Sequence, residues 1–196
     1  ICAPLLAPPD RLVADIRHRL PPPAWMAGGT PDHLLGTDQI GRDLLSRVIY
    51  GGRVSLVVGV AAVILSATIG ILAGLAAGYF GGSIDWLIMT LVNIILVFPF
   101  VLLALAVIAV LGPSLPNMIA VLGVAGWPIY ARVIRAETLA LREREFVTAG
   151  RALGMSHPRL IFRQILPNLI SASVVIATLQ VAQVLVLGSF LAFLGL

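Results

Sequence analysis

The 196-residue chain is 59% hydrophobic and 11% charged, and its mean hydropathy is +1.03. Soluble domains carry about a quarter charged residues, so this composition excludes an ordinary soluble domain and predicts a membrane protein. All thirteen cationic residues are arginines in loops beside hydrophobic segments, not on one basic face with interleaved aromatics, so we expect no nucleic-acid partner.

Residues 1–53 are expected to hold the end of a truncated first membrane helix, followed by a periplasmic segment. The chain begins at Ile1 and ends at Leu196, each within an apolar run, so we expect a fragment with spans cut at both ends. Cys2 is the single cysteine, which excludes an internal disulfide and a cysteine-based metal site. The histidines lack ligand-like spacing, so we expect no metal; they are His18, His33 and His157.

The periplasmic segment contains a candidate surface helix in GTDQIGRDLLSRVIYGGR, residues 36–53. Thr37 or Asp38 is predicted to cap the helix start. Apolar residues then recur at helical spacing, namely Ile40, Leu44, Leu45, Val48 and Ile49. The pattern favours a short amphipathic helix on the membrane surface before the first full span. The alternative is part of a dock for substrate delivery.

Four membrane spans are predicted within residues 54–196, at about 54–80, 84–111, 115–133 and 168–196. Each holds about 19 or more mostly apolar residues, enough for a hydrocarbon core roughly 30 Å thick. Lipid permits only helices or closed barrels, and these runs lack strand alternation. The expected fold class is therefore all-α, a polytopic transmembrane helix bundle.

The arginines also predict the orientation of the chain. The loop over residues 132–163 holds seven arginines against three glutamates, so the positive-inside rule places it in the cytoplasm. Counting spans backward puts residues 81–85 on the same side. Residues 112–116 and the segment before the first full span then lie outside.

A stripe of small residues follows one face of the first full span: Ala62, Ser66, Gly70, Gly74 and Gly78. Four-residue spacing of glycines lets two membrane helices approach closely. The favoured interpretation is helix packing within this chain. The alternative is packing against a second membrane chain.

Three amides lie at membrane depth and are candidates for a solute pathway: Asn93 in the second span, and Gln180 and Gln183 on one face of the last. Polar groups at this depth tend to face a bundle interior or a water-filled path. Neutral amides also join helices to one another, and this alternative stays open. Pro99 predicts a kink in the second span.

The cytoplasmic loop, about residues 136–167, predicts two short helices joined by a turn. Glu145 to Leu153 forms the first, with Phe146, Ala149, Ala152 and Leu153 available as contacts. Gly154 permits the turn. Ser156 is predicted to cap the second helix, and Pro167 is predicted to close it.

This loop resembles the EAA loop of ATP-binding-cassette importer permeases. Thr148-Ala149-Gly150 stands at the E-A-A positions, Gly154 at the glycine, and Leu166-Pro167 at the ending. The segments GTDQIGRD and RALGMSHPRLIFRQILPN are similar to the peptide/nickel class, the dipeptide and oligopeptide importers, and favour the C-type permease of the pair.

The resemblance implies a transporter subunit and not an enzyme. It implies a second permease, two cytoplasmic ABC ATPase subunits that receive the EAA loops and bind ATP and Mg, and an extracytoplasmic solute-binding protein. It also implies a multi-pass protein of the bacterial inner membrane. The chain itself has no GxxxxGK[ST] phosphate loop and no cofactor is expected in it. The alternatives are an ATPase-independent channel or scaffold and, less favoured, an intramembrane enzyme.

Overall fold

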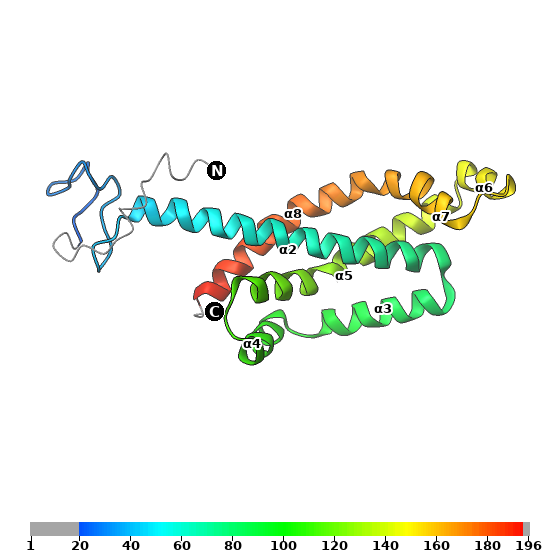
Figure 1. The fold of residues 1–196 in the computed structure, drawn as a ribbon, viewed down its shortest axis with the longest axis horizontal. Helices are drawn as coiled ribbons and strands as arrows, with labels where there is room; N and C mark the ends of the chain where they lie inside the picture. Colours follow the sequence, from blue (N-terminus) through cyan, green and yellow to red (C-terminus); the bar gives the residue numbers. More distant parts are fainter. Residues whose placement is uncertain (1–19, 194–196) are drawn as a thin grey trace. The chain divides into compact units, whose positions relative to one another are not determined.

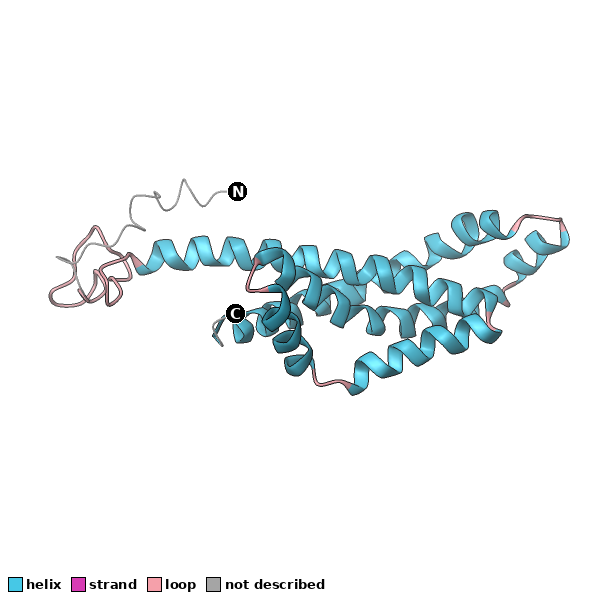
Figure 2. Ribbon diagram, turned by 60° about the horizontal axis from the view of Figure 1, so that its bottom comes forward, coloured by secondary structure: helices cyan, strands magenta, loops and turns pink. Residues whose placement is uncertain are grey.

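The computed structural model describes residues 20–193, which form helices and loops and contain no strand (Figures 1 and 2). The elements are α2 (Leu44–Phe80), α3 (Gly82–Val97), α4 (Phe100–Leu111), α5 (Leu115–Arg142), α6 (Glu145–Ala152), α7 (His157–Leu160), the π-helical turn η3 (Ile161–Ile165) and α8 (Leu166–Phe193). The all-α prediction is confirmed. The predicted end of a first membrane helix lies outside the described residues. The chain divides into two compact units between Val57 and Val58.

Three helices among the described residues are long and apolar enough to cross a membrane: Leu44–Phe80, Leu115–Arg142 and His157–Phe193. The helices α3 and α4 together are apolar enough for a fourth span, but they meet at an angle of 90°, as in a broken span or a re-entrant loop. The predicted kink at Pro99 is therefore a full break. Proline has no N–H to donate and disfavours helical backbone in the residue before it, and Phe98 is accordingly extended, with φ −72° and ψ 128°.

The predicted surface helix does not exist as a separate element. Residues 36–43 form a loop, and α2 then runs without interruption from Leu44 to Phe80. Asp43 precedes the helix, and its Oδ2 accepts hydrogen bonds from Ser46 N at 2.8 Å and Ser46 Oγ at 2.7 Å. The residue that caps the start of α2 is therefore Asp43, and not Thr37 or Asp38 as predicted.

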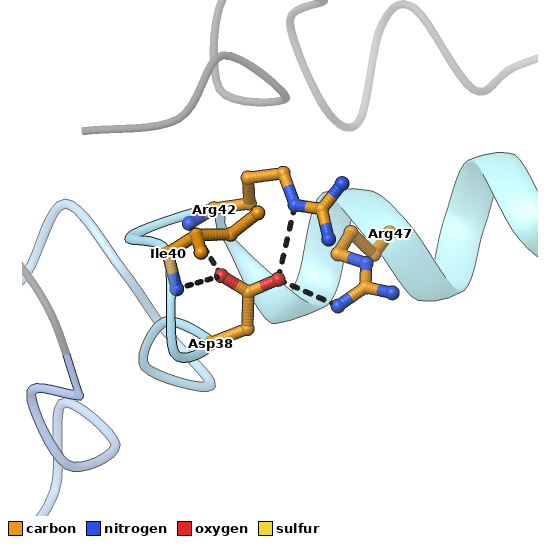
Figure 3. A network of polar contacts seen from close by, with 4 residues as sticks. All are labelled: Asp38, Ile40, Arg42 and Arg47. Carbon is orange, nitrogen blue, oxygen red and sulfur yellow. Dashed lines mark hydrogen bonds and ion pairs between the residues drawn. The ribbon is translucent and has the colours of Figure 1, made fainter. Parts of the chain in front are cut away.

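Asp38 instead organises the loop before α2 (Figure 3). Its Oδ1 accepts from the backbone N–H of Ile40 at 3.0 Å and of Arg42 at 2.9 Å. Its Oδ2 accepts from Arg42 Nε at 3.0 Å and from the Arg47 guanidinium at 2.6 Å. Arg42 and Arg47 therefore converge on one carboxylate, which closes the turn.

The small-residue stripe of α2 packs against α5 of the same chain. A Cβ at Gly70 would lie 2.4 Å from Tyr130 Cβ, and one at Gly74 would lie 2.6 Å from the Ala131 carbonyl oxygen. A Cβ at Gly78 would likewise lie 2.7 Å from Thr138 Cβ. Ser66 Oγ donates to the Gly123 carbonyl at 2.8 Å, so the same stripe also carries a hydrogen bond between the two helices. These residues serve packing within the chain, the first of the two alternatives.

Polar contacts join the C-terminal ends of α2 and α5 to the start of α3. The Arg135 guanidinium forms a two-bond ion pair with Asp85 on α3. Arg142 donates to the Gly78 carbonyl at 3.1 Å. The α2–α3 turn and the end of α5 therefore share one end of the second unit, as the predicted topology requires. The helix α5 continues nine residues past Val133, the predicted end of the third span, to Arg142.

Candidate functional site

The connection between α5 and α8 folds into two short helices around Gly154. Glu145 lies in the first turn of α6 and Arg151 in the last, where their charges complement the helix dipole. Gly154 follows with φ +79°, a conformation that L-residues with a Cβ rarely adopt. Ser156 occupies the N-cap position of α7, although its side chain makes no cap hydrogen bond, and Pro158 lies in the first turn of that helix. The helix–Gly–helix prediction is confirmed.

One face of this connection is buried on the ends of the long helices. Val147, Leu160 and Ile165 are fully buried and form a cluster with Ile161, Leu75, Tyr79, Ile134 and Leu169. Tyr79 at the end of α2 also places its hydroxyl 2.7 Å from Nδ1 of His157. The connection is therefore a rigid projection and not a loose loop.

Gly150 belongs to the buried face. A Cβ there would lie 2.9 Å from Leu160, 3.0 Å from the Met155 sulfur and 3.1 Å from Gln164. Gly150, which stands at one of the E-A-A positions, therefore packs closely against the second helix of the connection.

The opposite face is exposed, and we call it the α6 face: Glu145, Phe146, Thr148, Ala149 and Leu153. Phe146 is 44% exposed and Leu153 is 85% exposed. The Thr148 hydroxyl donates a hydrogen bond to the Glu145 carbonyl at 2.9 Å. Phe162, 59% exposed on η3, is a further exposed apolar side chain that sequence reasoning missed.

Leu166 and Pro167 do not end the second helix, contrary to the prediction. The π-helical turn Ile161–Ile165 passes directly into α8. A proline removes one helical hydrogen bond, and its ring crowds the carbonyl four residues earlier. The carbonyl four residues before Pro167 is that of Arg163, which lies within the π turn. The wider π turn therefore lets the helix continue through Pro167.

A cavity of about 390 Å³ lies in the second unit beside the break in the second span. Residues of the break, of α5 and of α8 line it, among them Phe98, Pro99, Gly126, Gln180 and Gln183. The structure therefore brings two of the three predicted pathway amides together. Asn93 lies elsewhere, because its Oδ1 accepts a hydrogen bond from Arg132 at 2.7 Å.

Sequence reasoning missed the aromatic wall of this cavity. Phe98 and Phe100 flank Pro99, and the break turns both toward the cavity lining. Pro99 was the sequence signal that could have pointed to these two residues, because they are its direct neighbours in the chain. Among residues 20–193, no group of three or more His, Cys, Asp or Glu side chains is placed to hold a metal ion.

Comparison with known families gives a match over residues 70–196, to the family described as binding-protein-dependent transport system inner membrane component. The chain belongs to this family. The match covers the cavity, the helix–Gly–helix connection and all of α8. Together with the apolar spans, it makes the chain a membrane protein, and it confirms the transporter family that the sequence resembled.

Members of this family with similar sequences include two peptide permeases. The dipeptide transport system permease protein DppC of Haemophilus influenzae is 40% identical over 196 residues, which are all of this chain and 66% of that protein. The di/tripeptide transport system permease protein DppC of Pseudomonas aeruginosa is 42% identical over 194 residues, 99% of this chain and 64% of that protein.

The name of a third relative gives a different transported molecule. The glutathione transport system permease protein GsiD of Pectobacterium atrosepticum is 35% identical over 169 residues, 86% of this chain and 56% of that protein. The chain thus spans no more than about two thirds of the length of these family members.

Proposed function

We propose that the chain is a membrane-spanning subunit of an ATP-driven importer for di- and oligopeptides or a related small solute, and not an enzyme. A second permease completes the pathway, and a periplasmic binding protein delivers the solute. Two cytoplasmic ATPase subunits bind ATP and Mg. The protein is a multi-pass component of the bacterial inner membrane. The names of the relatives, which include dipeptide, di/tripeptide and glutathione permeases, support the cargo class.

The observation that carries this proposal is the α6 face on its buried scaffold. An exposed pair such as Phe146 and Leu153 outside a span is unfavourable in water unless a partner covers it. Val147 and Leu160 hold the projection against α2 and α5, so force on the α6 face reaches the long helices. A rigid lever of this kind suits rigid-body switching of a helix bundle by a cytoplasmic ATPase.

The test is co-purification of the full-length protein with its ATPase subunits. Leu153→Arg places a charge at the most exposed apolar side chain of the α6 face. It should abolish retention of the ATPase while the protein still inserts in the membrane. Leu34→Arg is the matched control, since Leu34 is 50% exposed in the segment before α2. It should retain the ATPase.

Two outcomes would count against the proposal in different ways. Retention of the ATPase by Leu153→Arg would mean that the α6 face is not the docking surface. Failure of the unmodified protein to retain any ATPase would favour the alternative of an ATPase-independent channel or scaffold.

A further inference from the structure

The helix α5 holds a positive charge against α3 at the depth of the membrane. Arg132 donates through Nη2 to Oδ1 of Asn93 at 2.7 Å, and both side chains are exposed. From Gly82 to Asn93, α3 rises about 16 Å at about 1.5 Å per residue, which is roughly half of a hydrocarbon core about 30 Å thick. The bond therefore holds the guanidinium well inside the bilayer depth, and its exposure leaves it within reach of another molecule.

No acidic side chain of the described residues neutralises this charge. Asp85 on α3 forms both of its bonds with Arg135. Among residues 20–193, the neutral amide of Asn93 is the one polar partner of Arg132. A charged side chain at membrane depth is costly, and it usually pairs with an opposite charge or lines a water-filled path. Arg132 is therefore placed to bind an anion from outside the described residues.

The guanidinium keeps donors for such an anion. Of its five N–H groups, one on Nη2 is used by Asn93. A carboxylate has two oxygens, and it matches the planar fork of the remaining donors in a bidentate pair. The amide of Asn93 cannot neutralise the charge, but as an acceptor it fixes the direction in which the guanidinium points.

The charge lies one helical turn from the apolar cavity. Ile129 on α5 and Leu96 on α3 both line that cavity. Arg132 and Asn93 follow on the same two helices, each three residues nearer to the α2–α3 turn. One helical turn is about 5.4 Å, a distance that two extended peptide residues cover at about 3.3 Å each. A short peptide can therefore bring a terminal charge to Arg132 and an apolar side chain to the cavity.

We propose that Arg132 binds the terminal carboxylate of the peptide cargo inside the membrane, and that Asn93 is the positioning residue for the guanidinium. This inference rests on the proposed function. Dipeptides, tripeptides and glutathione, the molecules in the names of the relatives, all carry a free carboxylate. One guanidinium therefore serves the whole class without reading side chains. The same charge repels the terminal amine, which points away from Arg132.

The test compares Ala-Ala-Ala with its C-terminal amide, which lacks the carboxylate. Uptake of both is measured in proteoliposomes that contain the full-length chain with its partner subunits. The variants are Arg132→Gln, which removes the charge, Arg132→Lys, which keeps it, and Asn93→Leu, which removes only the positioning bond. Because the same binding protein delivers both peptides to every variant, its own preference cancels when the uptake ratios of two variants are divided.

We expect the ratio of acid to amide uptake to fall about tenfold in Arg132→Gln, as for the loss of a hydrogen bond to a charged group. Arg132→Lys should lose less, because the charge remains, and Asn93→Leu should lie between the unmodified chain and Arg132→Gln. Arg159→Gln is the matched control, an exposed arginine on α7 outside the spans. It should keep the ratio of the unmodified chain.

Three outcomes would count against the inference. An unchanged ratio in Arg132→Gln would overturn it and leave the proposed function standing. Loss of the second permease from purified Arg132→Gln would show that the charge pairs with an acid of that subunit, and would also overturn it. Uptake of neither peptide by the unmodified protein would remove both the inference and the proposed function.

A second measurement needs neither the binding protein nor a change at Arg132. In a Cys2→Ser background with any cysteine outside these residues also replaced, Ile129→Cys places the only thiol at an exposed edge of the cavity, one turn from Arg132. Millimolar Ala-Ala-Ala should slow labelling of this thiol by a maleimide in the purified complex, and the amide should slow it less. Equal labelling rates with the two peptides would overturn the inference.

Discussion

Gly154 shows how a single residue can be required by backbone geometry alone. Its φ of +79° lies in the left-handed region, yet a Cβ built there would meet no atom of the described part of the chain within 4 Å. Any cost of substitution is therefore conformational strain in the backbone and not a steric clash with neighbouring side chains.

We expect Gly154→Ala to lower the free energy of unfolding by about 1–2 kcal/mol, the cost of a left-handed conformation for a residue with a Cβ. Gly154→Asn is the control at the same position, because asparagine tolerates this region better, and should cost less. Thermal unfolding in detergent measures both. Equal stability of all three proteins would show that the turn does not need a positive φ.

The stability of the loop before α2 should depend on pH through the carboxyl group of Asp38. Burial alone would raise the pKa of this carboxyl, but the backbone N–H groups of Arg42 and Ile40, with the Arg42 side chain, outweigh it and lower the pKa from 3.8 to about 2. A lowered pKa means that the folded loop favours the carboxylate. The contribution to stability is complete above pH 3.8 and is lost as the pH falls through about 2.

Hydrogen exchange at the amides of Ile40 and Arg42 should report this loss, because both donate to Asp38. Protection should persist down to about pH 4 and fall below it. Asp38→Ala, which has no acceptor in its side chain, should lose protection at every pH, whereas Asp32→Ala, at an exposed neighbour, should behave as the unmodified chain. Protection unchanged at about pH 2 would contradict the assignment.

At the scale of elements, the close contact of α2 with α5 depends on glycine. Gly74 lies so near α5 that a Cβ would come within 2.6 Å of the Ala131 carbonyl oxygen. Backbone atoms cannot rotate away as side chains can, so the helices would have to separate. Gly51 lies in the same helix, but a Cβ added there would have no atom of residues 20–193 within 4 Å.

We therefore expect opposite effects from one chemical change in α2. Gly74→Ala should destabilise the protein by about 1–3 kcal/mol through overpacking. Gly51→Ala should be neutral or stabilise it by up to about 1 kcal/mol, since alanine is the better helix former. Unfolding in detergent compares the two. A similar effect of both substitutions would show that α2 and α5 do not pack through Gly74.

For the whole molecule, the decisive question is which ends of the spans face the cytoplasm. The polar contacts of Asp85, Arg142 and His157 gather the α2–α3 turn, the end of α5 and the α6–α7 connection at one end of the second unit. The positive-inside rule predicts that this end faces the cytoplasm.

Thiol labelling of intact cells tests this orientation. In the full-length chain with Cys2→Ser and any cysteine outside these residues also replaced, we expect a membrane-impermeant reagent to label Gln39→Cys but not Ser156→Cys. Both positions are exposed, whereas Ser46 is fully buried beside Asp43 and unsuitable as a probe. Permeabilised cells are the control and should give labelling at both positions. Labelling of Ser156→Cys alone in intact cells would invert the topology.

The sequence by itself determined the features that depend on neighbours along the chain. Apolar runs predicted the spans, Gly154 predicted the turn, Pro99 predicted the interruption, and the motifs around them predicted the family. Each follows from the length of a segment or the conformations open to one residue, so no distant contact is needed to read it.

Only the tertiary structure decided which faces meet and which stay exposed. It buried Gly150 and left Leu153 outside, joined Gln180 and Gln183 at one cavity, and directed Asn93 to Arg132. It also carried the last helix through Pro167. These outcomes depend on how long helices cross and on which carbonyl a side chain can reach, and spacing along one helix does not contain that information.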